Sequence, residues 1–167
     1  MEKLIKSKVM KYQDSVNTDV IFPGRYTYAL MEPEEMAKHA MEDLDPDFQK
    51  KVKERKIIVA GRNFGMGSSR EQAVLSLVYA GIKAIIAKSF ARIYFRNAIN
   101  NGLLVIEHKE AADFIEDGDE VEIDTQENKI RVKGKEFTFP QLPKEVLKIV
   151  EAGGLINYVK EELRKEE

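Results

Sequence analysis

The stretch GRNFGMGSSREQA, Gly61–Ala73, combines three glycines, two adjacent serines, two arginines and a glutamate. The run KIIVAG, residues 56–61, is short and apolar and predicts a buried strand. The run REQAVLSLVYAG after the glycines predicts a helix that ends at Gly81. Glycine lets a backbone turn with positive φ, and a helix N-terminus offers unpaired N–H groups to an anion. The stretch therefore predicts an anion-binding turn between a strand and a helix.

Two more strands and a helix are expected after this turn. Residues 82–89 and 103–108 are apolar and strand-like, and residues 91–102 between them predict a helix. Such alternation predicts right-handed crossovers and a parallel sheet. Residues 117–140 instead alternate in short runs broken by turn residues, which predicts antiparallel strands. We therefore expect an α/β fold with a parallel core segment and an antiparallel C-terminal extension, as a single domain over residues 1–167.

The flanking segments predict shorter elements. They are a strand over residues 4–12, a loop over 15–26, short helices over 32–44 and 46–54, and two helices over 143–167 separated by a Gly–Gly break.

The composition excludes several classes of protein. The chain has 167 residues, 43% of them apolar and 34% charged, as in an ordinary globular protein. The net charge of -2, with both signs interspersed, argues against nucleic-acid binding. No run approaches the length of a membrane span, and the N-terminus MEKLIKSKVMKY lacks an apolar signal core. We expect a cytoplasmic protein with no nucleic-acid or membrane partner.

The chain also lacks the residues that hold most protein-bound metals. It has no cysteine, so it cannot bind an iron–sulfur cluster through thiolates or form a disulfide. Its two histidines, His39 and His108, are too few for a typical zinc site. We expect His39 to be a solvated residue and His108 to have a structural role, with no cofactor or metal held by this chain alone.

The serines and the arginine of the glycine-rich turn allow two interpretations. In the structural one, Ser68 caps the helix and Glu71 completes a capping box. That interpretation leaves Arg70 unexplained, because a cation in the first helical turn opposes the helix dipole. Binding a carboxylate bidentately would explain Arg70. The spacing matches neither a Walker A loop nor Gly-x-Gly-x-x-Gly, so the residues alone lead to a carboxylate site.

Three motifs together carry a resemblance to a known family. They are GRNFGMGSSREQA, DSVNTDVIFPGRY at residues 14–26, and AKSFARIYFRNAINNGLLVI at residues 87–106. By their residues and by their order along the chain, they resemble small subunits of the isopropylmalate isomerase (3-isopropylmalate dehydratase) family, within the aconitase superfamily. The resemblance runs from about residue 10 to the C-terminal helix.

This resemblance implies a fold, a partner and a reaction. The fold would be the three-layer β/β/α swivelling domain of aconitase. A separate large subunit would carry three cysteines that hold a four-iron four-sulfur cluster. The pair would act as a hydro-lyase on a dicarboxylate, converting 2-isopropylmalate to 3-isopropylmalate by dehydration and rehydration in leucine biosynthesis. The absence of cysteine in this chain fits that division of labour.

The resemblance also assigns roles within the turn. Ser68 matches the family's general base, which removes a proton from the carbon next to a carboxylate. A serine can do this only if its alkoxide is stabilised by N–H groups and a nearby cation. Ser69 and Arg70 match residues that hold substrate carboxylate.

The second motif and the residues just after it are expected to set substrate specificity. Arg25 could bind a carboxylate or pair with an acidic surface residue. Relatives that accept a third carboxylate carry an arginine shortly after the tyrosine that matches Tyr26, and here that position is Tyr28, preceded by Thr27. An aromatic residue leaves a third carboxylate unpaired and suits an isopropyl group. This favours isopropylmalate over homoaconitate or citrate, with the small subunit of homoaconitase or of another alkylmalate dehydratase as the alternative.

Other features stay open at this point. Gln72 stands where many relatives have histidine, and it could alter only hydrogen bonds around the site. Arg92 and Arg96, spaced i, i+4, support packing or a subunit interface, or Arg92 faces a carboxylate. Asn101 with the glycine after it predicts a helix C-cap. A different class of function is also open, a non-catalytic anion-binding regulatory domain with no iron–sulfur partner.

Overall fold

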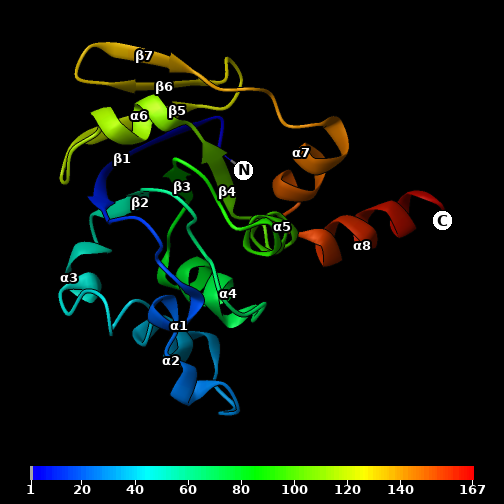
Figure 1. The fold of residues 1–167 in the computed structure, drawn as a ribbon. Helices are drawn as coiled ribbons and strands as arrows, with labels where there is room; N and C mark the ends of the chain where they lie inside the picture. The colour runs from blue at the N-terminus through cyan, green and yellow to red at the C-terminus, as the bar shows by residue number, and fades with distance from the viewer. Residues whose placement is uncertain (1) are drawn as a thin grey trace.

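The computed structural model describes residues 2–167 and contains one curled sheet of seven strands, in the order β4-β3-β2-β1-β5-β6-β7 (Figure 1). Strands β1 to β4 run parallel to one another, while β5, β6 and β7 continue from the other edge of β1 as an antiparallel meander. The strands are β1 (Leu4–Lys11), β2 (Arg55–Ala60), β3 (Ala84–Ala87), β4 (Leu104–Glu107), β5 (Glu120–Asp124), β6 (Lys129–Val132) and β7 (Lys135–Thr138).

The helices lie on and around this sheet. They are α1 (Thr18–Ile21), α2 (Pro33–Lys38), α3 (Phe48–Lys51), α4 (Gln72–Ala80), α5 (Arg92–Asn100), α6 (Lys109–Phe114), α7 (Lys144–Glu151) and α8 (Leu155–Lys165), with a 3-10 turn at Gly24–Tyr26. Among the described residues, no helix is long and apolar enough to cross a membrane.

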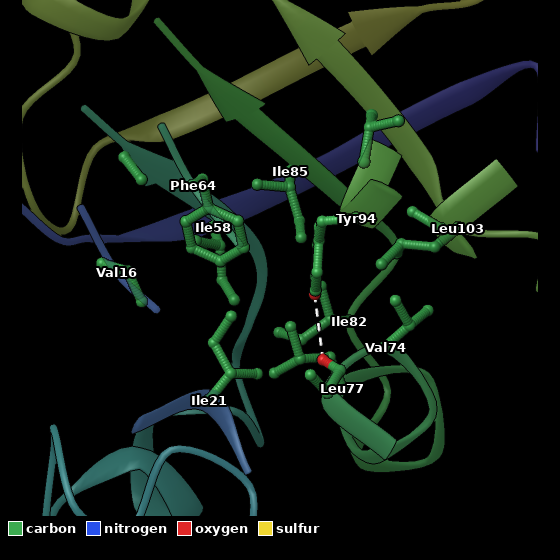
Figure 2. Packing of buried hydrophobic residues seen from close by; sticks show 14 of the residues in the cluster. Val16, Ile21, Ile58, Phe64, Val74, Leu77, Ile82, Ile85, Tyr94 and Leu103 are labelled. Carbon is green, nitrogen blue, oxygen red and sulfur yellow. Dashed lines mark hydrogen bonds between the residues drawn. The ribbon is translucent and has the colours of Figure 1, made fainter. Parts of the chain in front are cut away.

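Strand alternation divides the buried residues between two cores. In β2, Ile58 packs into a core under α4 and α5, whereas Ile57 points to the opposite face. Figure 2 shows the helix-side core, where the Tyr94 hydroxyl donates to the Ala73 carbonyl at 2.9 Å. The second core lies between the parallel strands and the curled antiparallel strands, with residues such as Ile130 facing inward. These layers are the predicted β/β/α arrangement, which is confirmed.

The antiparallel half buries only one of its faces. Along β6, Ile130 and Val132 are buried, while Lys129 and Arg131 point outward. We call the outward side chains of these strands the outer charged face. Its members are Glu122, Asp124, Lys129, Arg131 and Glu136. One-sided burial is why these strands alternate in sequence, whereas the doubly covered residues 57–60 of β2 and all of β3 are continuously apolar.

Two local predictions were wrong. Residues 15–26 were expected to be a loop, yet Thr18–Ile21 form a short helix because the Asn17 side chain accepts the Val20 amide at 3.0 Å. The helix predicted over residues 32–44 ends at Lys38. Because one sheet takes strands from Leu4 to Thr138, we infer that the chain forms one domain.

Candidate functional site

Two segments that are distant in the sequence join to form the site. Backbone hydrogen bonds tie the loop between β2 and α4 to the loop after β1, among them Gly65 N to Val16 O at 2.7 Å and Thr18 N to Met66 O at 2.9 Å. Residues 61–71 and residues 14–27 therefore form one surface. We call it the two-loop site.

Two glycines are needed for this close approach. Gly65 has a φ of 82°, and a Cβ there would lie 2.1 Å from the Tyr94 ring. Gly67 has a φ of 106°, and its Cβ would lie 3.1 Å from the Thr18 hydroxyl. Any residue with a Cβ would be strained by the positive φ and crowded by these neighbours. The glycines thus bring the following serines against Thr18.

Ser68 lies at the centre of the two-loop site. Its amide donates to Thr18 Oγ1 at 3.1 Å, and the two hydroxyl oxygens are also 3.1 Å apart. Arg70 Nε donates to Ser68 Oγ at 3.0 Å. Thr18 is only 1% exposed, whereas Ser68 is exposed. A buried hydroxyl and a cation therefore hold a serine hydroxyl that stays open to an approaching molecule.

Arg70 connects the two loops through its whole guanidinium group. Besides Ser68, it donates to Thr27 Oγ1 at 3.0 Å and to Asp19 Oδ1 at 2.8 Å. It also donates to the backbone carbonyls of Phe22, at 3.0 Å, and Thr18, at 3.3 Å. Its side chain is 14% exposed. In this arrangement the guanidinium is largely occupied by the protein itself.

The capping-box interpretation of Ser68 and Glu71 was wrong. Helix α4 begins at Gln72, and its N-cap residue Glu71 makes no side-chain capping bond. The Ser68 amide and hydroxyl are instead engaged by Thr18 and Arg70, so this hydroxyl caps nothing. Arg70 consequently precedes the helix, and its expected conflict with the helix dipole does not arise.

The remaining candidates lie around this centre. The Ser69 carbonyl accepts from Asn97 Nδ2 at 3.2 Å, and the Ser69 side chain is exposed. Gln72, which stands where many relatives have histidine, donates from Nε2 to the Thr27 carbonyl at 3.3 Å. It therefore also joins the two halves of the site. Tyr28 is 97% exposed beside them.

Arg25 lies away from Ser68 in an acidic cluster. It bonds Asp43 at 2.9 Å and also pairs with Glu42. Of the two arrangements considered for Arg25, the structure has the surface ion pair. His39 belongs to the same cluster, since its Nδ1 lies 2.7 Å from Glu42 and its ring stacks on Tyr26.

Sequence reasoning missed two supports of the site. Thr18 belongs to the NTD motif, but only the fold shows that its hydroxyl meets Ser68. Asn97 was not assigned to the site from the sequence, yet its Nδ2 donates to the Ser69 carbonyl and fixes the backbone of Ser69. His108 has a structural place, because its Nδ1 accepts the Ala111 amide at 3.0 Å and so caps α6.

The described residues offer no metal centre. Within residues 2–167, no group of three or more His, Cys, Asp or Glu side chains could hold a metal ion. Around Ser68 the site presents the hydroxyl groups of Thr18 and Thr27 and the Arg70 guanidinium, which is paired with Asp19. Hydroxyl and guanidinium donors suit an anionic substrate.

The curled sheet and the serine–arginine loop define an aconitase-type domain, and the family described as Aconitase C-terminal domain matches residues 7–111. The 3-isopropylmalate dehydratase small subunit of Caldicellulosiruptor saccharolyticus is 51% identical over 165 residues, 98% of this chain and 95% of the relative. That of Aquifex aeolicus is 50% identical over 166 residues, 98% of each chain.

A solved structure is similar across the whole fold. The crystal structure of 3-isopropylmalate dehydratase from Methanocaldococcus jannaschii has a TM-score of 0.91 and 48% sequence identity, covering 98% of this chain and 97% of that one. The chain belongs to the family of 3-isopropylmalate dehydratase small subunits.

Proposed function

We propose that this chain is the small subunit of a hydro-lyase that isomerises 2-isopropylmalate to 3-isopropylmalate in leucine biosynthesis, and that it acts only with a large subunit. The observation that carries the proposal is the exposed Ser68 hydroxyl, which accepts a hydrogen bond from Arg70 Nε at 3.0 Å on the surface of a small-subunit family member. An open face at the catalytic serine is what a two-chain active site requires.

The chemistry assigned to Ser68 is proton transfer at the carbon next to a carboxylate. A serine hydroxyl is a weak base, and its deprotonated form needs a nearby cation and donors. Arg70 Nε supplies the cation, and the buried Thr18 fixes the direction of Ser68 through its amide and hydroxyl. This fixed geometry supports Ser68 as the base that both removes and returns the proton.

The four-iron four-sulfur cluster belongs, in this proposal, to the large subunit. This chain has no cysteine, and residues 2–167 contain no group of metal ligands, so it offers the cluster no anchoring site. When bound by the partner, the cluster would polarise the leaving hydroxyl as a Lewis acid.

Substrate binding by this chain would use Ser69 and Arg70. The Ser69 hydroxyl has no hydrogen-bond partner among the described residues, and its backbone is fixed by Asn97. It is therefore free to donate to a substrate carboxylate. Arg70 already bonds five oxygen atoms of the chain, so its main contribution is the positive charge it places beside that carboxylate.

The loop around Tyr28 supports isopropylmalate as the substrate. A third carboxylate would need a free cation here, but Arg25 is paired with Glu42 and Asp43. Arg70 is held by its own loops, and Tyr28 itself is exposed and uncharged. A substrate with an unpaired third carboxylate is rejected more strongly than one that differs by a methylene group.

Reconstitution tests the proposal directly. The purified chain, its large subunit and the mixture should be assayed with 2-isopropylmalate, homoaconitate, citrate and other alkylmalates. We expect turnover only in the mixture, with 2-isopropylmalate giving the highest kcat/KM. Turnover by this chain alone would refute the division of labour, and a preference for homoaconitate would refute the substrate assignment.

A further inference from the structure

Residues 28–32, which we call the Tyr28 loop, leave the two-loop site at Thr27 and are held by few contacts of their own. The side chains of Tyr28 and Leu30 are almost fully exposed, so neither packs on the rest of the chain. Within residues 2–167, the amides of Tyr28, Leu30 and Met31 donate no backbone hydrogen bond. The direction of the loop therefore depends on the residue from which it starts.

Thr27 anchors the start of the Tyr28 loop through its hydroxyl. Thr27 Oγ1 donates to the Gly24 carbonyl at 2.6 Å and accepts from Arg70 at 3.0 Å. A hydroxyl carries a single proton, so Thr27 Oγ1 cannot also donate to a substrate carboxylate. Its role in this arrangement is to hold the loop.

The guanidinium that bonds Thr27 also bonds the proposed base. Arg70 Nε donates to Ser68 Oγ at 3.0 Å, and another nitrogen of the same planar group donates to Thr27 Oγ1. The donors of a guanidinium have fixed directions, so Arg70 sets the position of Thr27 relative to the Ser68 hydroxyl. Tyr28 directly follows Thr27, and the loop expected to select the substrate therefore starts beside the residue expected to transfer the proton.

Gln72 holds Thr27 at a second atom. Its Nε2 donates to the Thr27 carbonyl at 3.3 Å, across 45 residues of sequence. Gln72 is the first residue of α4, and the next two residues of that helix, Ala73 and Val74, are fully buried. The carbonyl that Gln72 bonds belongs to the planar peptide between Thr27 and Tyr28. A packed helix thus fixes the peptide that leads directly into the Tyr28 loop.

We propose that Gln72 is a positioning residue for substrate selection, which acts through the Thr27–Tyr28 peptide to fix the direction in which Tyr28 meets the substrate. With this peptide held, Tyr28 does not have to be ordered when the substrate binds, and a group ordered in advance binds more tightly. The inference rests on the proposed function and names a further residue that sets its specificity.

Gln72→Met in the complex with the large subunit tests this role. Methionine keeps the length of the side chain but donates no hydrogen bond. We expect KM for 2-isopropylmalate to rise about ten-fold with kcat nearly unchanged, because a group that contacts the substrate equally in the ground and transition states affects KM alone. The preference for 2-isopropylmalate over its methyl analogue should fall about five-fold. Gln72→His, whose ring N–H can donate, should restore both values.

Gln49→Met is the matched control. Gln49 Nε2 also donates to a backbone carbonyl, that of Ala37 at 2.9 Å, and it ties α3 to α2. Its KM and substrate preference should equal those of the wild type. A merely structural bond would lower Tm in either variant and leave the preference as it was. An unchanged preference in Gln72→Met, or an equal change in both variants, would overturn the proposal.

A double-mutant cycle tests whether Gln72 acts through Tyr28. In a Tyr28→Ala background, Gln72→Met should change the substrate preference by less than about two-fold, because the side chain that it positions is gone. A further loss in that background as large as the loss in the wild-type background would overturn the proposal.

Proteolysis of the free chain gives a readout that does not depend on catalysis. Chymotrypsin accepts aromatic side chains, and Tyr28 is exposed to it. Cleavage after Tyr28 should be about five-fold faster in Gln72→Met than in Gln49→Met, because cleavage follows the population of the released loop. Equal rates would overturn the inference. A wild-type complex that does not act on 2-isopropylmalate would instead refute the proposed function, so the two failures are distinguishable.

Discussion

Two arginines, Arg70 and Arg131, each contact several oxygen atoms, but they differ in exposure and in the kind of oxygen they contact. Arg70, 14% exposed, bonds two hydroxyls, two backbone carbonyls and one carboxylate of the two-loop site. Arg131, 30% exposed on the outer charged face, is within ion-pair distance of four carboxylates.

The difference lies in what each arginine can hold in place. The partners of Arg70 are mostly neutral atoms of loops that lie about fifty residues away in sequence, so it fixes long-range geometry. The partners of Arg131 belong to neighbouring strands that main-chain pairing already holds. Exposed ion pairs contribute little to stability and are screened by salt. We therefore expect substitutions at the two-loop site to alter catalysis and substitutions on the outer charged face to alter almost nothing.

The largest effect should come from Ser68→Ala in the complex with the large subunit. Loss of the proposed base should lower kcat by about three orders of magnitude, within the range that general acid–base catalysis supplies. Ser76→Ala is the matched control, because the Ser76 hydroxyl is buried in α4 without a hydrogen-bond partner. Its kcat should equal that of the wild type. A loss of less than ten-fold for Ser68→Ala would reject the assignment.

Thr18→Val should give the next largest effect. Valine keeps the shape of threonine but removes the oxygen that meets both the Ser68 amide and its hydroxyl. We expect kcat to fall about ten- to a hundred-fold with little change in KM, because misplacement of a catalytic group mainly weakens the transition state. Thr18→Ser should restore most of the rate. An equal loss in both variants would indicate a packing role instead.

Tyr28→Arg adds a guanidinium that lacks the acceptors surrounding Arg70 and Arg131. Because Tyr28 is 97% exposed, the fold should tolerate the change. A free cation can pair a third carboxylate, so the ratio of kcat/KM for homoaconitate to that for 2-isopropylmalate should rise about ten-fold. Tyr28→Gln, polar but uncharged, is the control and should leave the ratio near the wild-type value. An unchanged ratio in the arginine variant would show that this loop does not set specificity.

Much of the fold was predictable because its signals are local. Continuous apolar runs at β2, β3 and β4 and helical periodicity between them predict the parallel segment. The position of β1 in the sheet was not predictable, because the side-chain pattern of a strand does not determine which strands pair with it. It pairs in parallel with β2, more than forty residues later, and antiparallel with β5. Such long-range pairing is decided by the whole sheet.

The residues of the candidate site could be picked out from the sequence, but the tertiary contacts between them could not. The glycines, Ser68 and Arg70 stand out in the sequence, whereas the Thr18–Ser68 contact joins residues fifty positions apart. The same contact explains the incorrect capping box. The local pattern assigned Ser68 to the helix N-terminus, but Ser68 makes hydrogen bonds to Thr18 and Arg70 instead. Local signals thus selected Ser68 and Arg70, which the fold brings into contact, but assigned Ser68 the wrong hydrogen-bond partner.

The smallest effect should follow Arg131→Gln. The outer charged face should lose its ion pairs, yet Tm should change by about 2 °C or less, and turnover should stay at the wild-type value. The variant's deficit should shrink in about 1 M salt, where exposed charges are screened. A larger loss of Tm that persists in high salt would mean that Arg131 holds the strands together.

The Tm difference between wild type and Arg131→Gln should become smaller in acid. The Glu127 amide, together with Gln126 and Arg131, lowers the pKa of Asp124 below its ordinary value. A lowered folded-state pKa contributes stability above the unfolded-state pKa, near 3.9, and this contribution is lost as pH falls through the folded-state pKa. The Tm difference between wild type and Arg131→Gln should therefore be constant from about pH 5 to 7 and shrink as the pH falls below about 4 and through the folded-state pKa. Thermal melts across this range measure it, and a difference that grew in acid would contradict the ion-pair origin of the effect.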